Sequence, residues 1–265
     1  MAKPLVSDAL WQRVESLLPP PKRRRFRYPG RKPLDRRKVL TGIVFVLKTG
    51  IPWEGLPQEL GCGCGMSCLN YLKAWQRAGV WQRLHEVILA ELQHADCLDW
   101  SRAAADSSHA RALGGGENSG KNPTDRAKLG TKHQVLTDAR GIPLSVQATG
   151  SNLNDVQGLL PLVDSVPRVR GRVGRPRCRP KVLYADRGYD SDTHRRELRR
   201  RHIVPRIARR FTENGSGLGV YRWVVERTIS WLHGFRRLRL RTDRNGQVHR
   251  AFLALAAAII NLGFL

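Results

Sequence analysis

The sequence predicts an α/β fold in which a mixed sheet is flanked by helices and preceded by an all-helical region. Up to about residue 98, apolar residues recur at the three- and four-residue spacing of helices. After Trp100 the pattern changes to short β-rich runs, and further along these runs alternate with helical segments. We therefore expect two regions, a helical one over residues 1–98 and an α/β one over residues 99–265.

The helical region begins with an amphipathic segment over residues 1–18. In residues 37–50, Leu40, Ile43, Val44 and Leu47 lie on one helix face, and Gly50 is expected to end that helix. A short element over residues 53–60 precedes a third helix, for which Ser67 is a suitable N-cap.

Three short helices with a polar-faced third one are typical of a helix-turn-helix module, and a small helical bundle has the same pattern. In this third helix Lys73 and Arg77 are on the outward face, and we expect them to contact DNA. A further helix, which begins after Gly79, would link the two regions.

The chain carries a strong excess of positive charge. Its 47 Lys and Arg against 22 Asp and Glu give a formal net charge of +25 and a sequence pI near 11.2. A polyanion is the expected partner, with nucleic acid ahead of a membrane surface. Residues 19–37 are rich in Pro and Arg, and we predict an extended arm that lies along DNA phosphates through Lys22, Arg23, Arg24 and Arg25. A solvated linker is the alternative.

No segment is predicted to enter a membrane. The N-terminus lacks the apolar run and small-residue cleavage site of a signal peptide. The apolar residues 251–265 are fewer than the roughly 20 that span a bilayer, so we expect a buried helix there. Five cysteines without paired CxxC spacing fit a reducing compartment, and a cytoplasmic location is expected.

The α/β region reads as an ordered series of strands and helices. A strand is expected to end at Asp106, and "TKHQVLTD" and "IPLSVQAT" form a hairpin. Asn154 and Asp155 open a helix, after which "KVLYAD", "SDTHRRELRRR" and "HIVPRIA" read as strand, helix and strand, followed by a helix through Glu226. Residues 114–125 are predicted to be a mobile loop over a site, or else a surface insertion.

Two aspartates stand where apolar strands are expected to stop. Asp186 follows "VLYA", and Asp106 follows a run of alanines. The ends of central strands in α/β sheets open onto the crevice where ligands bind. If the two strands are neighbours, the carboxylates converge, and Mg²⁺ or Mn²⁺ would relieve their repulsion.

Glu226 is the candidate for a third ligand. Arg222, Glu226 and His233 form a polar stripe on one side of the predicted helix. An Arg that grips phosphate beside a Glu that holds metal fits a site with two ions about 3.5–4 Å apart, as used for in-line phosphoryl transfer. The spacing alone is equally that of a surface salt bridge.

The motifs "ADRGYDSD", "GSGLGVYRWVVERTISWLHGFRRLRLR", "TKHQVLTDARGIPLSVQATGSNLND" and "PWEGLPQELG…AWQRAGVWQRLHEVI" together resemble an insertion-sequence transposase of the IS5 type, within the IS4-like DDE group. The resemblance covers nearly the whole chain. It implies an RNase H-like catalytic domain, a triad formed by Asp106, Asp186 and Glu226, and two divalent ions, Mg²⁺ or Mn²⁺. It also implies cleavage of double-stranded DNA at the ends of the element, attack of the freed 3′-hydroxyl on target DNA, and a homodimer that pairs two ends.

One part of the family pattern is altered. Of Tyr-x2-Arg-x3-Glu-x6-Lys, only Arg222 and Glu226 are met, because Gly219 takes the Tyr place and His233 the Lys place, with Tyr221 nearby. We assign DNA phosphate contacts to Arg222 and His233. Arg187 is a further candidate for DNA contact, and it is expected to pair with Asp186 when no metal is bound.

Two other functions are compatible with the same features. The chain could be a transposase-derived protein that binds element ends without cutting them, or an RNase H-like nuclease that acts on RNA-containing or structured substrates. The basic arm and the helical region argue against a simple nuclease, which has no need of a sequence reader.

Overall fold

The N-terminal region is helical, as the sequence predicts. The computed structural model describes residues 4–21, 26–28, 30–171, 173–211 and 217–265, so the predicted contacts Lys22, Arg23, Arg24 and Arg25 lie outside the described residues. The elements of this region are α1 (Asp8–Leu17), α2 (Arg36–Thr49), the 3-10 turns η1 (Trp53–Gly55) and η2 (Gln58–Leu60), α3 (Gly65–Arg77) and α4 (Val80–His94).

The ends of these helices follow local chemistry. Helix α2 ends at Gly50, whose φ of 74° is in the left-handed region that glycine adopts without strain. Helix α3 begins at Gly65 rather than after Ser67, so the predicted N-cap is wrong. A Cβ at Gly65 would lie 1.7 Å from the carbonyl oxygen of Trp53. This close backbone approach requires glycine at the first turn of α3 and fixes where the helix starts.

The α/β region contains a mixed sheet. Its path runs β2-β3-β1-β5-β6, with β4 also paired to β3 and β7 to β1, and β3 is antiparallel to each of its neighbours. The strands are β1 (Ala103–Ala112), β2 (Gly120–Lys121), β3 (Leu129–Asp138), β4 (Pro143–Gly150), β5 (Val182–Ala185), β6 (Val204–Ile207) and β7 (Leu240–Arg241). The predicted hairpin is β3–β4.

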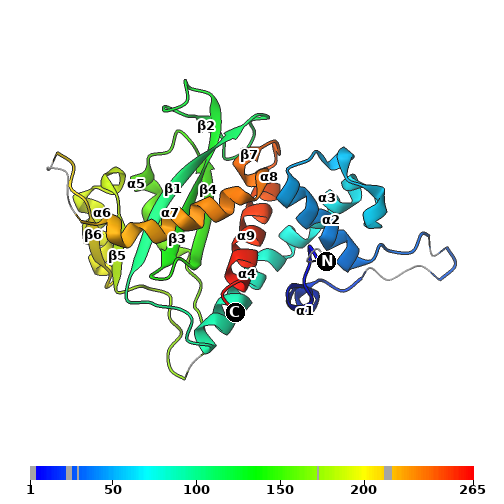
Figure 1. The fold of residues 1–265 in the computed structure, drawn as a ribbon, viewed down its shortest axis with the longest axis horizontal. Coiled ribbons are helices and arrows are strands. Elements are labelled where there is room, and N and C mark those ends of the chain that lie inside the picture. The colour runs from blue at the N-terminus through cyan, green and yellow to red at the C-terminus, as the bar shows by residue number, and fades with distance from the viewer. Residues whose placement is uncertain (1–3, 22–25, 29, 172, 212–216) are drawn as a thin grey trace.

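Helices cover both faces of this sheet (Figure 1). Helices α4, α7 and α9 pack on one face and α5 packs on the other. The remaining elements are α5 (Asp155–Asp164), the 3-10 turn η3 (Arg187–Tyr189), α6 (Asp192–Arg200), α7 (Gly219–Gly234), α8 (Arg236–Arg239) and α9 (Gly246–Leu262). The N-cap of α5 is Asn154, while Asp155 is its first residue.

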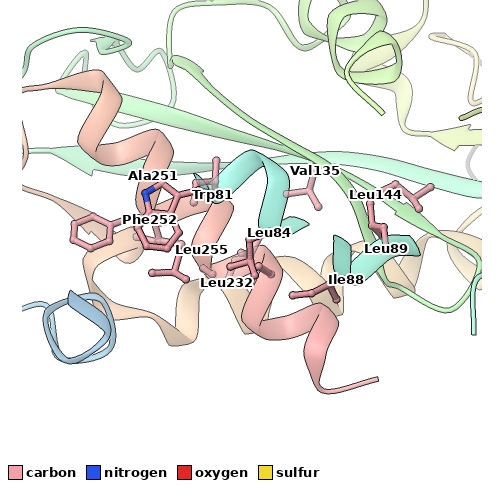
Figure 2. Close-up of a cluster of buried hydrophobic side chains, with 14 of the residues drawn as sticks. Trp81, Leu84, Ile88, Leu89, Val135, Leu144, Leu232, Ala251, Phe252 and Leu255 are labelled. Atoms are coloured by element: carbon pink, nitrogen blue, oxygen red, sulfur yellow. The ribbon is translucent and has the colours of Figure 1, made fainter. Parts of the chain in front are cut away.

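The hydrophobic core is continuous across residues 98 and 99. Figure 2 shows Trp81 and Leu84 of α4 against Ala251, Phe252 and Leu255 of α9, together with side chains from β3, β4 and α7. The apolar C-terminal run is therefore a buried helix, as predicted. Over the part of the chain that the structure describes, no helix has the length and apolar character needed to cross a membrane.

The segment 114–125, expected to move over a site, is tied to the body of the protein. Arg241, whose side chain is fully buried, donates hydrogen bonds to the backbone carbonyls of Glu117 and Asn118. The segment follows the C-terminal end of β1, several residues beyond Asp106. These contacts favour the alternative of a docked surface insertion.

Candidate active site

Neighbouring strands bring Asp106 and Asp186 to the same level of the sheet. Strands β1 and β5 are parallel and pair Ala103 with Leu183 and Ala104 with Tyr184. Each aspartate follows two residues after the second of these pairs. The sequence-based expectation that the two strands are neighbours is confirmed by this pairing.

The expectation that β1 ends at Asp106 is wrong. The strand continues to Ala112 because β3 pairs with it from Ala103 to Arg111, with Val135 opposite Asp106, and β7 pairs with Ala112. What ends near Asp106 is the parallel pairing with β5. Asp106 therefore lies in mid-strand, at the point where the parallel neighbour turns away.

The Asp106 carboxylate is largely buried and has two hydrogen-bond donors. Arg222 Nη2 is 3.2 Å from its Oδ2, and the backbone N–H of Ser107 is 2.8 Å from its Oδ1. The pKa of Asp106 is raised to about 6, mainly by burial and also by the charges of Asp186 and Glu226, while the Ser107 N–H and Arg222 oppose the shift. The other two acids of the predicted triad, Asp186 and Glu226, thus act electrostatically on the Asp106 carboxyl group.

Asp186 directly follows β5 and is the N-cap of the 3-10 turn η3. Its Oδ1 accepts a hydrogen bond of 2.9 Å from the N–H of Gly188. A Cβ at Gly188 would lie only 3.0 Å from that same oxygen, so a larger residue would push against the carboxylate. Arg187, a predicted DNA contact, is the first residue of η3, and its carbonyl accepts from Arg210 Nε.

Glu226 lies on α7, which packs across β1 (Figure 1). Its side chain is 59% exposed, and its Oε1 is 3.9 Å from Arg222 Nη2. Arg222 therefore contacts both Asp106 and Glu226, and the surface ion pair compatible with the spacing is also present. Among the residues that the structure describes, no three His, Cys, Asp or Glu side chains are gathered closely enough to hold a metal ion.

His233, which takes the Lys place of the family pattern, and Tyr221, which lies near its Tyr place, each contact a side chain of the sheet. His233 Nε2 is 3.0 Å from Ser108 Oγ on β1, and burial lowers the pKa of His233. The ring of Tyr221 stacks on that of Tyr184 in β5, with centroids 4.7 Å apart. Both side chains attach α7 to the strands that carry the aspartates. The predicted phosphate contact of His233 stays a prediction.

Lys73 and Arg77, the predicted DNA contacts on α3, line a groove against the start of α9. Two adjoining hollows of about 430 and 510 Å³ share Lys73 and Asn245, and Arg244 lies in the first and Arg77 in the second. The polar face of α3 thus borders the α/β region rather than standing apart from it.

Asp155 and Lys132 were not identified as site residues from the sequence. Asp155 was interpreted as a helix cap, but its Oδ1 accepts from Ser107 Oγ at 2.7 Å and from Lys132 Nζ at 2.8 Å. The signal that could have pointed to this pair is Lys132 itself, a charged residue in β3, which is buried along almost its whole length. A lysine in such a strand requires a buried partner.

The donor chemistry of the site fits a divalent cation. Carboxylate oxygens are the ligands that Mg²⁺ and Mn²⁺ prefer. The raised pKa of Asp106 indicates that its negative charge is poorly compensated, which a cation would correct. Asp106, Asp186 and Glu226 are the residues that would hold it.

Comparison with known proteins identifies the family. A sequence model of IS4/5-family transposases matches residues 6–85, and a model of the transposase DDE domain matches residues 98–262. The transposase assigned to insertion sequence element IS402 of Burkholderia cepacia is 59% identical over 146 residues, which are 55% of this chain and 69% of that protein. A 16.2 kDa protein of the same element is 57% identical over 123 residues, 46% of this chain and 84% of its own length.

Among solved structures, a pre-cleavage Mos1 transpososome covers 97% of this chain and 86% of that chain at 12% identity, with a TM-score of 0.27. The match to the DDE domain and the sheet described above confirm the RNase H-like class, and the DDE domain implies dependence on divalent metal. The chain belongs to the IS5-type transposases of the IS4-like DDE group.

Proposed function

We propose that this DNA transposase binds the ends of its insertion sequence and cuts and rejoins DNA at a site formed by Asp106, Asp186 and Glu226. The observation that carries this assignment is that adjacent parallel strands place the two aspartates at the same level of the sheet, with Arg222 paired to both Asp106 and Glu226. The surrounding groups suit phosphodiester chemistry, because Arg222 can exchange its carboxylate contacts for a bidentate contact to phosphate.

Mg²⁺ or Mn²⁺, as two ions in each site, is the proposed cofactor. When bound, these ions would activate the attacking oxygen and stabilise the leaving one during in-line displacement. The chain would supply as ligands Asp106 on β1, Asp186 directly after β5, and Glu226 on α7 from the solvent side. His233 and Arg187 are proposed to contact the DNA backbone near the cut.

The DNA is proposed to run from the active site toward α3. Lys73 and Arg77 border the groove with Arg244 and Asn245, and the basic arm of residues 19–37 is proposed to lie along the same duplex. A homodimer that pairs two element ends is proposed as the active assembly. Its place of action would be the bacterial cytoplasm, at the nucleoid.

The test is cleavage of labelled DNA that carries the ends of the encoding element, in Mg²⁺ or Mn²⁺, by wild type and by Glu226→Gln. We expect wild type to nick at the ends, and the variant to lose activity by at least roughly three orders of magnitude while it still binds the same DNA. Glu86→Gln, a change at an exposed residue of α4, is the matched control and should cut normally.

Two results would contradict this proposal. Tight binding of the ends without metal-dependent cleavage by wild type would support a transposase-derived binder. Cleavage of RNA–DNA hybrids or unrelated duplexes at rates equal to those on element ends would support a nuclease.

A further inference from the structure

Asp155 contacts β1 from the face opposite to the Asp106 side chain. Successive side chains of a strand point to opposite faces, so Asp106 and Ser108 face α7 whereas Ser107 faces α5. Ser107 donates through its hydroxyl to Asp155 and through its N–H to Asp106. It is therefore bonded directly to both carboxylates.

The charge of Asp155 is balanced by a buried lysine. Lys132 Nζ is 2.8 Å from Asp155 Oδ1 and 2.7 Å from the carbonyl of Leu153, and its side chain is only 4% exposed. A buried ammonium group requires such partners, so Lys132 holds the Asp155 carboxylate in place. The pair brings a carboxylate near the triad without adding net negative charge.

The second oxygen of Asp155 faces the turn that follows Asp186. A Cβ at Gly188 would lie 3.0 Å from Asp186 Oδ1 and 3.6 Å from Asp155 Oδ2, so both oxygens border the same point of the turn. The adjacent Tyr189 hydroxyl is buried, and the carboxylates of Asp155, Asp106 and Asp186 contribute to its raised pKa. One carboxylate thus borders both segments that carry a catalytic aspartate.

Backbone pairing between β1 and β5 does not hold these two segments together, so another contact is needed. The pairs between β1 and β5 stop at Ala104 and Tyr184, before either aspartate is reached. Beyond that point Asp106 and Asp186 repel each other, and backbone pairing between the two strands does not oppose their separation.

We infer that Asp155, held by Lys132, is a positioning residue that keeps Ser107 and the η3 turn together, and thereby sets the Asp106 and Asp186 carboxylates for divalent-metal binding. This inference deepens the proposed function, since it rests on those aspartates as the metal ligands. Asp155 acts through its neighbours and is not proposed to touch DNA or metal.

The test measures Mn²⁺ affinity of the full-length protein without DNA, by electron paramagnetic resonance of free Mn²⁺, together with Tm and end cleavage. Asp155→Ala should weaken Mn²⁺ binding roughly 10- to 100-fold, the range typical of lost supporting contacts around metal ligands. Asp164→Ala, on the same helix but paired with Arg201 away from the site, is the control and should leave Mn²⁺ affinity unchanged.

A second variant separates positioning from folding. In Lys132→Met with Asp155→Asn, both charges are removed but the Asn oxygen can still accept from Ser107. Asp155→Ala lowers the logarithm of the Mn²⁺ affinity by a measured amount. We expect the double variant to recover more than half of that decrease. Wild-type Mn²⁺ affinity in Asp155→Ala would overturn the inference. So would a double variant that regains the Tm of wild type but no Mn²⁺ affinity.

The outcome is distinguishable from failure of the proposed function. If wild type does not cut element ends but Asp155→Ala still weakens Mn²⁺ binding, the positioning role stands and the proposed reaction fails. If wild type cuts and Asp155→Ala binds Mn²⁺ and cuts as wild type does, only the positioning role fails.

Discussion

Asp106 is held where its charge opposes folding. Its folded-state pKa of about 6 is above the ordinary value of 3.8, so ionisation at neutral pH favours the unfolded chain. Arg222 offsets part of this cost in the metal-free protein. The buried negative charge of Asp106 thus destabilises the metal-free protein but favours the binding of a cation. Such a conflict between stability and function is common in functional sites.

Replacement of this carboxylate should stabilise the metal-free protein. The net pKa shift of Asp106, which already includes the opposing effect of Arg222, corresponds to about 3 kcal/mol at a pH above both values, and burial of the polar Asn amide would keep part of that cost. We expect Asp106→Asn to raise the free energy of unfolding by about 1–2 kcal/mol at pH 7.5, measured by urea denaturation in EDTA. An equal or lower unfolding free energy would show that the burial of Asp106 is not costly. Asp192→Asn, at an exposed residue paired with Arg209, is the control.

At the scale of elements, strands and helices were predictable because their signals are local. The spacing of Leu40, Ile43 and Leu47 and the stop at Gly50 predicted α2, and the two β-rich runs "TKHQVLTD" and "IPLSVQAT" predicted the β3–β4 hairpin. Asp186 was placed correctly at the end of β5, since a short apolar run and its first polar residue can be read directly.

The sequence-based predictions were wrong where the structure depends on contacts between segments that are distant in the sequence. The length of β1 depends on β3, the start of α3 depends on the Trp53 carbonyl, and the role of Asp155 depends on Ser107, 48 residues away. The polar stripe of the predicted helix made Glu226 a candidate ligand, but its spacing could not separate a metal ligand from a surface ion pair, and the resemblance favoured the metal ligand. None of these contacts produces a regular spacing of apolar or polar residues that could be recognised in the sequence.

A pair of buried histidines joins β3 to α9. His133 Nε2 and His249 Nε2 are 2.8 Å apart, and both rings are fully buried. Burial lowers the pKa of His133 to about 3, with the charges of His233 and Arg241 adding to the shift, and burial also lowers that of His249. Both rings must therefore stay neutral for β3 and α9 to remain packed.

This packing should weaken in acid. Because the folded-state pKa of His133 is depressed, its contribution is fully present above pH 6.5 and is lost as pH falls from 6.5 toward 3. At pH 5 the loss from His133 is about 2 kcal/mol. We expect urea unfolding at pH 7.5 and pH 5 to show a smaller decrease for His133→Gln than for wild type, by about that amount. Equal decreases in the two proteins would contradict the role of the pair.

At the scale of the whole molecule, the helical region and the α/β region share one core. Leu84 of α4 is fully buried among residues that include Phe252 and Leu255 of α9 (Figure 2). The boundary at residues 98 and 99 therefore separates segments of sequence but not separate cores.

A cavity in this shared core should destabilise both regions together. We expect Leu84→Ala to cost about 2–5 kcal/mol, and calorimetry to show one unfolding transition that shifts as a whole. Leu113→Ala, at an exposed leucine after β1, is the control and should change Tm little. Two transitions, with only one of them shifted, would indicate that the regions unfold independently.

The shared core also fixes the distance between α3 and the candidate active site. If α3 contacts the element end as proposed, the packing of α3 and α4 against α9 fixes the distance from the base pairs that α3 contacts to the phosphodiester at Asp106. An extra base pair between them would leave the contacted base pairs unchanged and present a different phosphodiester for cutting. The spacing between the contacted base pairs and the cut would then be set by the protein's own dimensions.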